Sequence, residues 1–189
     1  MALPTLDIVR DDLVIRPYRS GDAAALVESV TESAEHLRPW MPWIAHEPQS
    51  VEDRLAFIAE GNRAWEAGGD MSFGIFLGEK LVGGCGLHRR GGPEQLDIGY
   101  WVHVDHVGKG YATAAAGALT GAAFLLPGIE YVEIHHDKAN VASRRVPEKL
   151  GYRFVAETPD ERLSPGDTGI DCAWRMDRSD WRGNPPWPD

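Results

Sequence analysis

The sequence has little cysteine, no long apolar run and no excess of basic residues. Two cysteines in 189 residues, Cys85 and Cys172, are too few for a disulfide framework, so we expect reduced thiols and a cytoplasmic protein. No apolar stretch approaches the roughly 18–20 residues of a membrane span, and segment 1–7 lacks the pattern of a signal peptide. The formal net charge of -10 disfavours nucleic acid and anionic membranes as partners and favours a cationic substrate such as an amine.

The composition is that of a folded chain with a full core. Hydrophobic residues make up 43% and charged residues 25%, which excludes disorder by composition. The length suits one domain, which we place at residues 1–178. Segment 179–189 is rich in proline and glycine, so we expect an irregular C-terminal tail.

Hydrophobic periodicity and turn residues predict a mixed α/β (α+β) fold, with about seven strands in one sheet and about four helices on its faces. The expected order is strand, two helices, three strands, helix, strand, helix and two strands. The strands are expected at 13–17, 71–77, 80–87, 95–104, 129–136, 152–157 and 168–176, and the helices at 22–29, 51–67, 110–126 and 140–150. The second helix has Ser50 as its cap, and its buried side is expected to be Leu55, Phe57, Ile58 and Trp65.

A glycine turn between a predicted strand and a predicted helix is the strongest local signal for function. Strand 97–104 leads into the turn 106–110, and the long helix follows. A helix N-terminus carries partial positive charge, and Gly108 and Gly110 let the backbone approach an anion closely. The turn matches neither the dinucleotide fingerprint nor the P-loop. By itself it predicts an anion site, with a plain strand–turn–helix junction as the alternative.

Four segments, taken in order, resemble the GNAT superfamily of acetyltransferases. Segment 105–110 is similar to the family's Gln/Arg-x-x-Gly-x-Gly/Ala motif. Segment 140–152 is similar to its Asn-x-x-Ser helix, which ends in Leu-Gly-aromatic, and 97–102 to the strand beside the pantetheine arm. Segment 36–43 resembles the Rim-type branch (RimJ/RimL-like), which acetylates the N-termini of ribosomal proteins.

This resemblance implies a GNAT fold and acetyl-CoA as co-substrate. It implies cofactor contacts on the strand end, the glycine turn and the helix that begins after Asn140. The implied residues are Trp101, Val102, His103, Val107, Gly108, Lys109, Gly110, Tyr111, Ala112, Asn140 and Ser143.

Two positions depart from the family's pattern. Asp105 stands where the family usually has Gln or Arg, so we expect its carboxylate to point to solvent or to contact Lys109. Backbone amides would then carry the binding of the cofactor. Pro147 stands where many members have a tyrosine that donates a proton to the departing thiolate. The resemblance to the Rim-type branch implies that Ser143 takes this role, the alternative being an ordinary helix hydroxyl.

Acetyl transfer needs a neutral amine and a donor for the oxyanion of the tetrahedral intermediate. An α-amine has a pKa near 8, so roughly a tenth is neutral at pH 7 and a modest base suffices. A backbone N–H near Val102 or His103 can serve as the oxyanion donor. By resemblance Glu161 is the first candidate base, although it is also typical of a solvated loop. His88 and His103 are alternative bases.

His136 aligns with a position near the thioester in the Rim-type branch, which suggests a local proton relay. The run His135-His136-Asp137 could also be interpreted as a set of metal ligands. Neighbouring strand residues point to opposite faces, so His135 and His136 cannot chelate one ion together. We therefore predict no metal.

The loop with Trp40, Met41 and Trp43 resembles the segment that walls the acceptor site in Rim-type enzymes, and core packing is the alternative. The leading hypothesis is an N-acetyltransferase that acts on a protein or peptide N-terminal α-amine, as a monomer or homodimer. A small-molecule amine (antibiotic, aminoacyl-nucleotide or polyamine) is the nearest alternative acceptor. A non-catalytic acetyl-CoA-binding module is the alternative from another class.

Overall fold

The computed structural model describes residues 13–183, so the expectations for segment 1–7 and for the end of the tail lie outside the described residues. Within that range seven strands form one sheet in the order β1-β2-β3-β4-β5-β7-β6. The strands are β1 Leu13–Pro17, β2 Met71–Leu77, β3 Lys80–His88, β4 Gln95–Val102, β5 Tyr131–Asp137, β6 Arg153–Pro159 and β7 Ile170–Asp177. All neighbours are antiparallel except β4 and β5, which are parallel.

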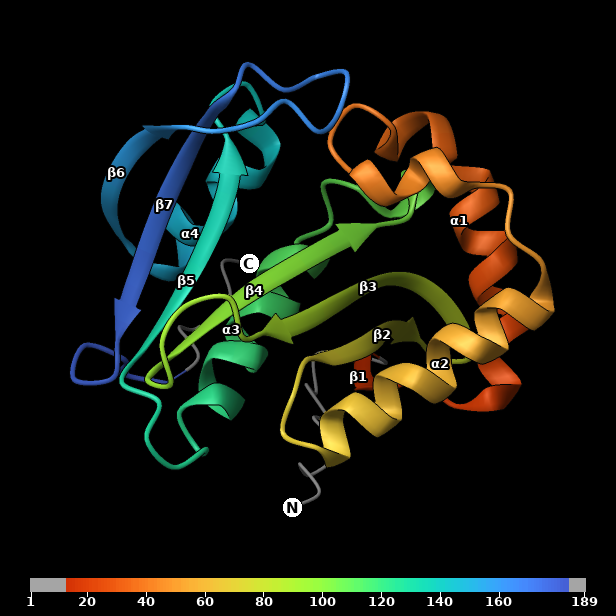
Figure 1. Cartoon of the computed structure of the whole chain (residues 1–189), viewed down its shortest axis with the longest axis horizontal. Coiled ribbons are helices and arrows are strands. Elements are labelled where there is room, and N and C mark those ends of the chain that lie inside the picture. The colour runs from red at the N-terminus through yellow and green to blue at the C-terminus, as the bar shows by residue number, and fades with distance from the viewer. Residues whose placement is uncertain (1–12, 184–189) are drawn as a thin grey trace.

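Four α-helices cover the two faces of this sheet (Figure 1). Helices α1 Ala23–Leu37 and α2 Val51–Glu66 pack on one face against Phe76 and Leu81. Helices α3 Tyr111–Ala123 and α4 Val141–Leu150 cover the other face, where Ile15 and Phe73 join the larger core. The expected mixed sheet, the four helices and the order of the elements are confirmed.

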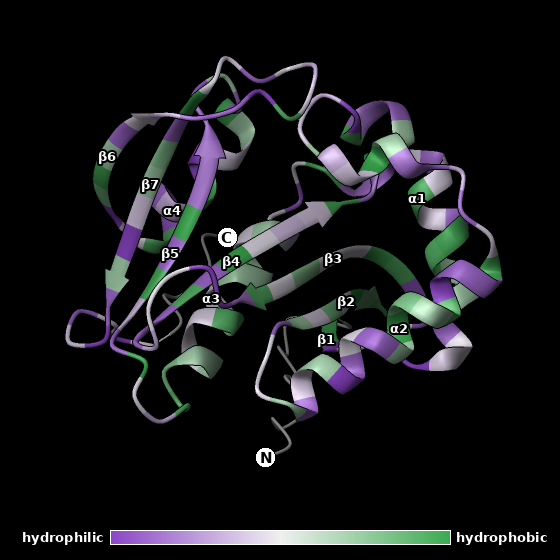
Figure 2. Ribbon diagram, viewed as in Figure 1, coloured by the Kyte–Doolittle hydropathy of each residue, from purple (hydrophilic) through white to green (hydrophobic). Residues whose placement is uncertain are grey.

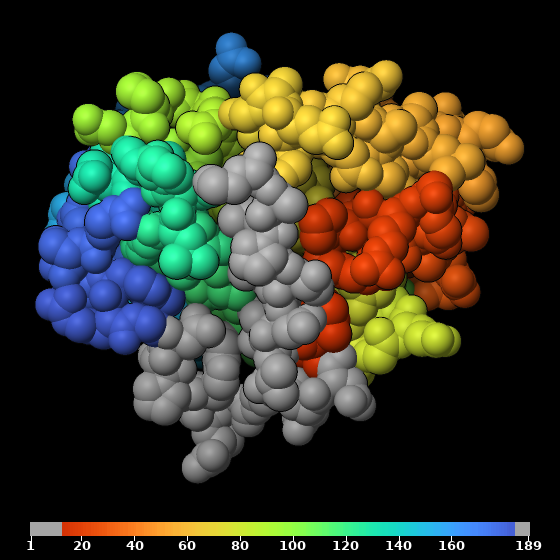
Figure 3. All heavy atoms as spheres, turned by 90° about the horizontal axis from the view of Figure 1, so that it is seen from below, coloured from red at the N-terminus to blue at the C-terminus, as the bar shows by residue number. Residues whose placement is uncertain are grey.

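The two ends of the sheet carry different parts of the chain. Seen from below, the N-terminal helices and the C-terminal strands lie on opposite sides of the molecule (Figure 3). Colouring by hydropathy shows apolar residues along β2 and β3 and mixed polarity on α2 (Figure 2). No helix within residues 13–183 combines the length and the apolar character needed to cross a bilayer.

Helix α1 is much longer than expected and contains His36 and Leu37, which the sequence placed in a loop. The prediction ended this helix at about Ser29. Ser29 and Ser33 are nevertheless buried, in register with Val30 and Leu37. Small hydroxyl residues can therefore continue a buried helical face that a hydrophobic pattern does not show.

Helix α2 begins as predicted but buries a different side. Ser50 accepts a hydrogen bond from the Asp53 N–H at 3.1 Å and completes a capping box. The prediction for Leu55 and Phe57 was wrong, since they are 39% and 42% exposed. The buried residues are Ile58, as expected, and Arg54, whose guanidinium pairs with the Glu47 carboxylate. A charged residue on the inner face needs a partner from another segment, which periodicity cannot reveal.

Several element ends also differ from the prediction. Helix α3 ends at Ala123 because the N–H groups of Leu125 and Leu126 bond three residues back, which tightens the last turn. Strand β4 ends at Val102 because His103 caps the short 3₁₀ turn Val104–His106. After β7, residues 178–183 form neither helix nor strand. Trp181 nonetheless packs against Phe124.

Candidate active site

Strands β4 and β5 diverge in the middle of the sheet. They pair only over Gln95–Asp97 with Tyr131–Glu133, although β4 continues to Val102 (Figure 1). Beyond Asp97 the edge of β4 that faces β5 pairs with no strand among residues 13–183. Such an opening exposes backbone groups of both strands inside the fold, where a substrate can bond to them.

The backbone donors along this edge can be identified from the pairing of β4 with β3. The His103 N–H donates to the Val82 carbonyl at 2.9 Å, so it is engaged within the fold. Along an antiparallel pair, successive residues alternately form hydrogen bonds with the neighbouring strand and point their N–H groups away from it. Because His103 bonds to β3, the N–H groups of Tyr100 and Val102 point away from β3 and toward the opening. Of the two expected oxyanion donors, only Val102 therefore has an N–H that faces the opening.

The glycine turn has the geometry of an anion site. Gly108 and Gly110 have φ angles of 75° and 85°, which only glycine adopts at little cost. Gly110 is the N-cap of α3 and supplies no side-chain cap, and the first turn of α3 holds no acidic residue. Val107 and Lys109 are exposed beside it, while Tyr111 and Ala112 begin the helix half-buried. Uncapped N–H groups next to a lysine fit a pyrophosphate.

Asp105 lies at the edge of this turn. Its side chain is exposed, and its N–H donates to His103 Nδ1 at 3.1 Å. No ion pair joins Asp105 to Lys109 within the described part of the chain. The structure therefore shows the first of the two expectations, in which the Asp105 carboxylate points to solvent. The proposed anion site would then consist of backbone amides and Lys109.

On the other side of the opening, Asn140 and Ser143 begin α4. The Asn140 side chain accepts the Ser143 N–H at 3.0 Å, which caps the helix as expected. The Ser143 hydroxyl lies 3.0 Å from the hydroxyl of Tyr100, which comes from β4. Tyr100 was not among the expected site residues. The sequence could have indicated that Tyr100 points inward, because it lies two positions after Ile98 on the same face of β4.

A cavity of about 1030 Å³ extends over the sheet face that α1 and α2 partly cover. The predicted acceptor residues Trp40, Met41 and Trp43 all line it. Its wall also includes residues of the opening and of α4, namely Tyr100, Trp101, His136, Asn140 and Ser143. The tertiary structure thus brings the expected acceptor loop and several expected cofactor residues to one cavity.

The acceptor loop is held in place from two directions. The ring of Trp43 packs edge-on against Trp101 of β4, with centroids 6.2 Å apart. The Pro39 carbonyl accepts the Gly166 N–H at 2.9 Å, which ties the loop to the segment before β7. A side chain at Gly166 would collide with Pro39 and Trp40. The wall is therefore built from aromatic side chains with fixed positions.

The family model for the acetyltransferase (GNAT) domain matches residues 12–153, which is most of the chain. The chain belongs to the GNAT acetyltransferases. A relative in Bacillus subtilis, YdaF, provisionally named a ribosomal N-acetyltransferase, is 29% identical over 146 residues, covering 76% of this chain and 79% of its own.

Solved structures of this fold include two that were determined with a cofactor. RimL, a ribosomal L7/L12 α-N-protein acetyltransferase in complex with coenzyme A, has a TM-score of 0.83 at 17% identity and covers 94% of this chain and 98% of its own. The microcin C7 self-immunity acetyltransferase MccE, in complex with acetyl-CoA and AMP, has a TM-score of 0.81 at 17% identity, covering 89% and 94%. At this identity they show a shared fold.

Two of the predicted catalytic residues of this acetyltransferase lie in positions that restrict their roles. Glu161 is exposed and does not line the cavity. His136 lines it, but both of its ring nitrogens are engaged. Nδ1 donates to the Asp137 carbonyl at 2.8 Å, and Nε2 accepts the Trp174 indole N–H at 3.0 Å. A proton relay through His136 requires one of these bonds to break.

The alternative base His88 lies in the cavity with one nitrogen available. Its Nδ1 is 3.0 Å from the Asp70 carboxylate, which orients the ring and leaves Nε2 as the acceptor of the neutral imidazole. That Nε2 lies over β4, 3.3 Å from the position of a Cβ on Gly99. In contrast, His103 is only 1% exposed, and its ring bonds to Glu32 and to the Asp105 N–H.

His88 and Ser143 thus approach β4 from its two faces at the same level. Successive strand residues point to opposite faces. His88 lies over Gly99, and the next residue, Tyr100, points to the other face and contacts Ser143. A candidate base and a hydroxyl therefore lie on opposite faces of β4.

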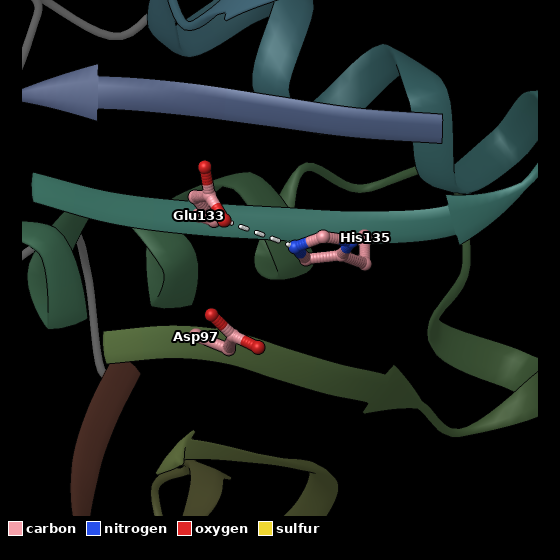
Figure 4. Close-up of side chains that lie close together, drawn as sticks. All are labelled: Asp97, Glu133 and His135. Carbon is pink, nitrogen blue, oxygen red and sulfur yellow. Dashed lines mark hydrogen bonds and ion pairs between the residues drawn. The ribbon is translucent and has the colours of Figure 1, made fainter. Parts of the chain in front are cut away.

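Asp97, Glu133 and His135 form a cluster next to the cavity, on β4 and β5 (Figure 4). His135 and His136 lie on opposite faces of β5, as predicted. The members of the cluster are already paired: Glu133 accepts from Arg175 and Gln95, and Asp97 accepts from Gln95. Burial favours a raised pKa for Glu133, but its bonds with His135 and Arg175 lower the pKa below its usual range. These contacts form a network in which positive and negative side chains compensate one another.

This network predicts a specific pH dependence of stability. The bonds with Asp171 and Glu133 raise the pKa of His135 to about 10. Because this pKa exceeds the ordinary value of about 6.5, the stabilisation is complete below about pH 6.5 and is lost as the pH rises through about 10.

We expect urea denaturation to show falling stability from neutral pH toward pH 10. His135→Gln should flatten this decline, whereas His36→Gln, at an exposed site, should not. Equal pH profiles for the wild type and His135→Gln would contradict the assignment.

Proposed function

We propose that this acetyltransferase transfers the acetyl group of acetyl-CoA to the α-amine of a protein or peptide N-terminus. The observation that carries the proposal is the meeting of His88, the opening beside β4 and the Trp40–Trp43 wall in one cavity. A volume of about 1030 Å³ is at the upper end of small-molecule sites, about 300–1,000 Å³, and suits the first residues of a peptide. RimL is named as an α-N-protein acetyltransferase of ribosomal L7/L12, and YdaF is provisionally named a ribosomal N-acetyltransferase, which supports this class of acceptor.

The residues around the opening fit acetyl-CoA as donor. The N-terminus of α3 with Gly108, Lys109 and Gly110 would hold the pyrophosphate, and the free edge of β4 would bond the pantetheine arm. Bound there, acetyl-CoA supplies an activated thioester. The Val102 N–H is the proposed donor to the oxyanion, and Ser143 the donor to the departing sulfur.

His88 is the base that the cavity favours. In the proposal His88 Nε2 takes the proton from the attacking amine, and Asp70 holds the ring through Nδ1. Glu161, the base that the family resemblance predicts, remains the alternative. Glu161 itself does not line the cavity, although Leu163 and Asp167 of the same loop do, so its side chain would have to turn toward the cavity to serve.

A small amine is the second candidate acceptor, because Trp43 and Trp101 place two indoles beside each other in the cavity. Flat rings of this kind stack on nucleobases and on cations, and MccE was solved with AMP beside acetyl-CoA.

The test is a thiol-release assay with acetyl-CoA and a panel of acceptors. The panel contains peptides with free N-terminal alanine or serine, the same peptides with a blocked N-terminus, aminoglycosides, polyamines and a stable aminoacyl-adenylate analogue. We expect steady turnover with the free peptides and none with the blocked peptides. Turnover confined to the small amines would refute the peptide acceptor, and no turnover with any member would refute transfer to amines.

A further inference from the structure

The hydroxyl of Tyr100 lies between two oxygens of Ser143. It is 3.1 Å from the Ser143 carbonyl oxygen and 3.0 Å from the Ser143 hydroxyl. A carbonyl oxygen only accepts hydrogen bonds, so Tyr100 is the donor in that contact. One phenol from β4 therefore bonds both the backbone and the side chain of the first turn of α4.

Pro147 explains why the Ser143 carbonyl is available. In an α-helix the carbonyl of one residue accepts the N–H of the residue four positions later. For Ser143 that residue is Pro147, which has no N–H. The Tyr100 hydroxyl occupies the acceptor that the proline leaves without a helical partner. Pro147, which replaces the tyrosine that many family members carry here, thus also creates the place where another tyrosine binds.

We propose that Tyr100 is the positioning residue that holds the Ser143 hydroxyl toward the departing thiolate. This inference rests on the proposed acetyl transfer and deepens it. When the carbon–sulfur bond breaks, its electron pair goes to sulfur, and the Ser143 hydroxyl turns to donate to that sulfur. The Tyr100 hydroxyl then donates to Ser143 Oγ. The sulfur leaves as a thiolate that accepts this hydrogen bond. The proton that the amine loses passes to His88 and then to solvent, and the thiolate takes up a proton from solvent, so no further reactant is needed.

Tyr100 keeps its own proton in this arrangement. Burial raises the pKa of its hydroxyl above the usual value, although the bond with Ser143 lowers the pKa in part. A tyrosinate at this position is therefore unfavourable, and Tyr100 acts by orienting Ser143. A thiolate accepts a stronger hydrogen bond than a neutral phenol does, which favours the turn of the Ser143 hydroxyl.

The test compares Tyr100→Phe with Ser143→Ala and with the double variant. Phenylalanine keeps the ring in place and removes only the hydroxyl. We expect kcat to fall about tenfold, the equivalent of one well-placed hydrogen bond, while KM for acetyl-CoA changes less than about twofold. A residue that acts through Ser143 has nothing to orient once that hydroxyl is gone. The double variant should therefore be no slower than Ser143→Ala.

Tyr152→Phe is the matched control. Its hydroxyl is also buried and also bonds a hydroxyl, Thr120 Oγ1, at 2.6 Å. We expect a lower thermal midpoint and an unchanged kcat. If Tyr100→Phe also keeps full kcat, or if the double variant loses the product of the two single losses, the proposal is overturned.

A second measurement does not depend on turnover. Pro147→Ala supplies the missing N–H to the Ser143 carbonyl, so this carbonyl no longer needs Tyr100. We expect Tyr100→Phe to lower the thermal midpoint by several degrees in the wild type and by clearly less in the Pro147→Ala background. Equal losses in both backgrounds overturn the contact and the proposal with it. A wild type that acetylates no amine refutes the proposed function, and this stability comparison still decides whether the Tyr100 hydroxyl holds the Ser143 carbonyl of α4.

Discussion

Replacing His88 by alanine is expected to lower kcat/KM for the acceptor amine by about 100-fold, the lower range for loss of a general base. The physical reason is that His88 Nε2 faces the cavity over Gly99 while Asp70 holds Nδ1. KM for acetyl-CoA should remain close to that of the wild type, since His88 lies on the face of β4 opposite to Ser143. Initial rates at varied concentrations of acceptor and acetyl-CoA measure both effects.

Glu161→Ala is the decisive companion to this variant. If Glu161 is the base, its loss produces the 100-fold effect and His88→Ala remains fast, which reverses our assignment. Asp70→Asn should also lower kcat/KM, because an amide N–H that donates to Nδ1 favours the tautomer in which Nε2 already carries a proton and cannot accept one. His36→Ala, which removes an exposed imidazole at the end of α1, should retain the full rate.

Replacing Arg54 by alanine is expected to lower the free energy of unfolding by about 3–5 kcal/mol. Arg54 and Glu47 are each only 7% exposed in their side chains, and the guanidinium pairs with the carboxylate. The alanine variant leaves the Glu47 carboxylate buried with only the Gln49 N–H as a partner, at 3.0 Å. An uncompensated buried charge is far more costly than the pair itself is stabilising. Urea denaturation at neutral pH measures the loss.

Arg63→Ala provides the control on the same helix. Arg63 pairs with Glu60 at 71% and 70% side-chain exposure, so its removal should change stability by less than about 1 kcal/mol. The double variant Arg54→Met with Glu47→Gln removes both charges and should be more stable than Arg54→Ala alone. Similar losses for Arg54→Ala and Arg63→Ala would show that the buried pair does not carry the expected energy.

The local geometry of the proposed cofactor side could be predicted from the sequence, because its residues are close together in the chain. The anion site consists of one turn and the helix that follows it, and Asn140 caps a helix three residues before Ser143. Local geometry of this kind depends on φ angles and capping, which single residues such as Gly110 and Asn140 largely determine.

The acid–base residues could not be assigned in the same way. His88, Gly99 and Ser143 come from three different elements, and their proximity depends on the register of β3 with β4 and on the packing of α4. The contact of Tyr100 with Ser143 was not predicted, because it requires knowing both that α4 lies on the inward face of β4 and that Pro147 leaves a carbonyl available. The exposed position of Glu161 likewise follows from a loop whose course the sequence does not specify.

The amino-acid sequence by itself determined the family, the order of the seven strands and four helices, and the glycine turn at the start of α3. These features follow from periodicity, capping and φ preferences that act within a few residues. Only the tertiary structure decided which side of α2 is buried, which histidines line the cavity, and which hydroxyls meet at α4. Each of these depends on a partner that is distant in the chain: Glu47 for Arg54, Asp70 for His88 and Ser143 for Tyr100. Only the folded sheet brings such partners together.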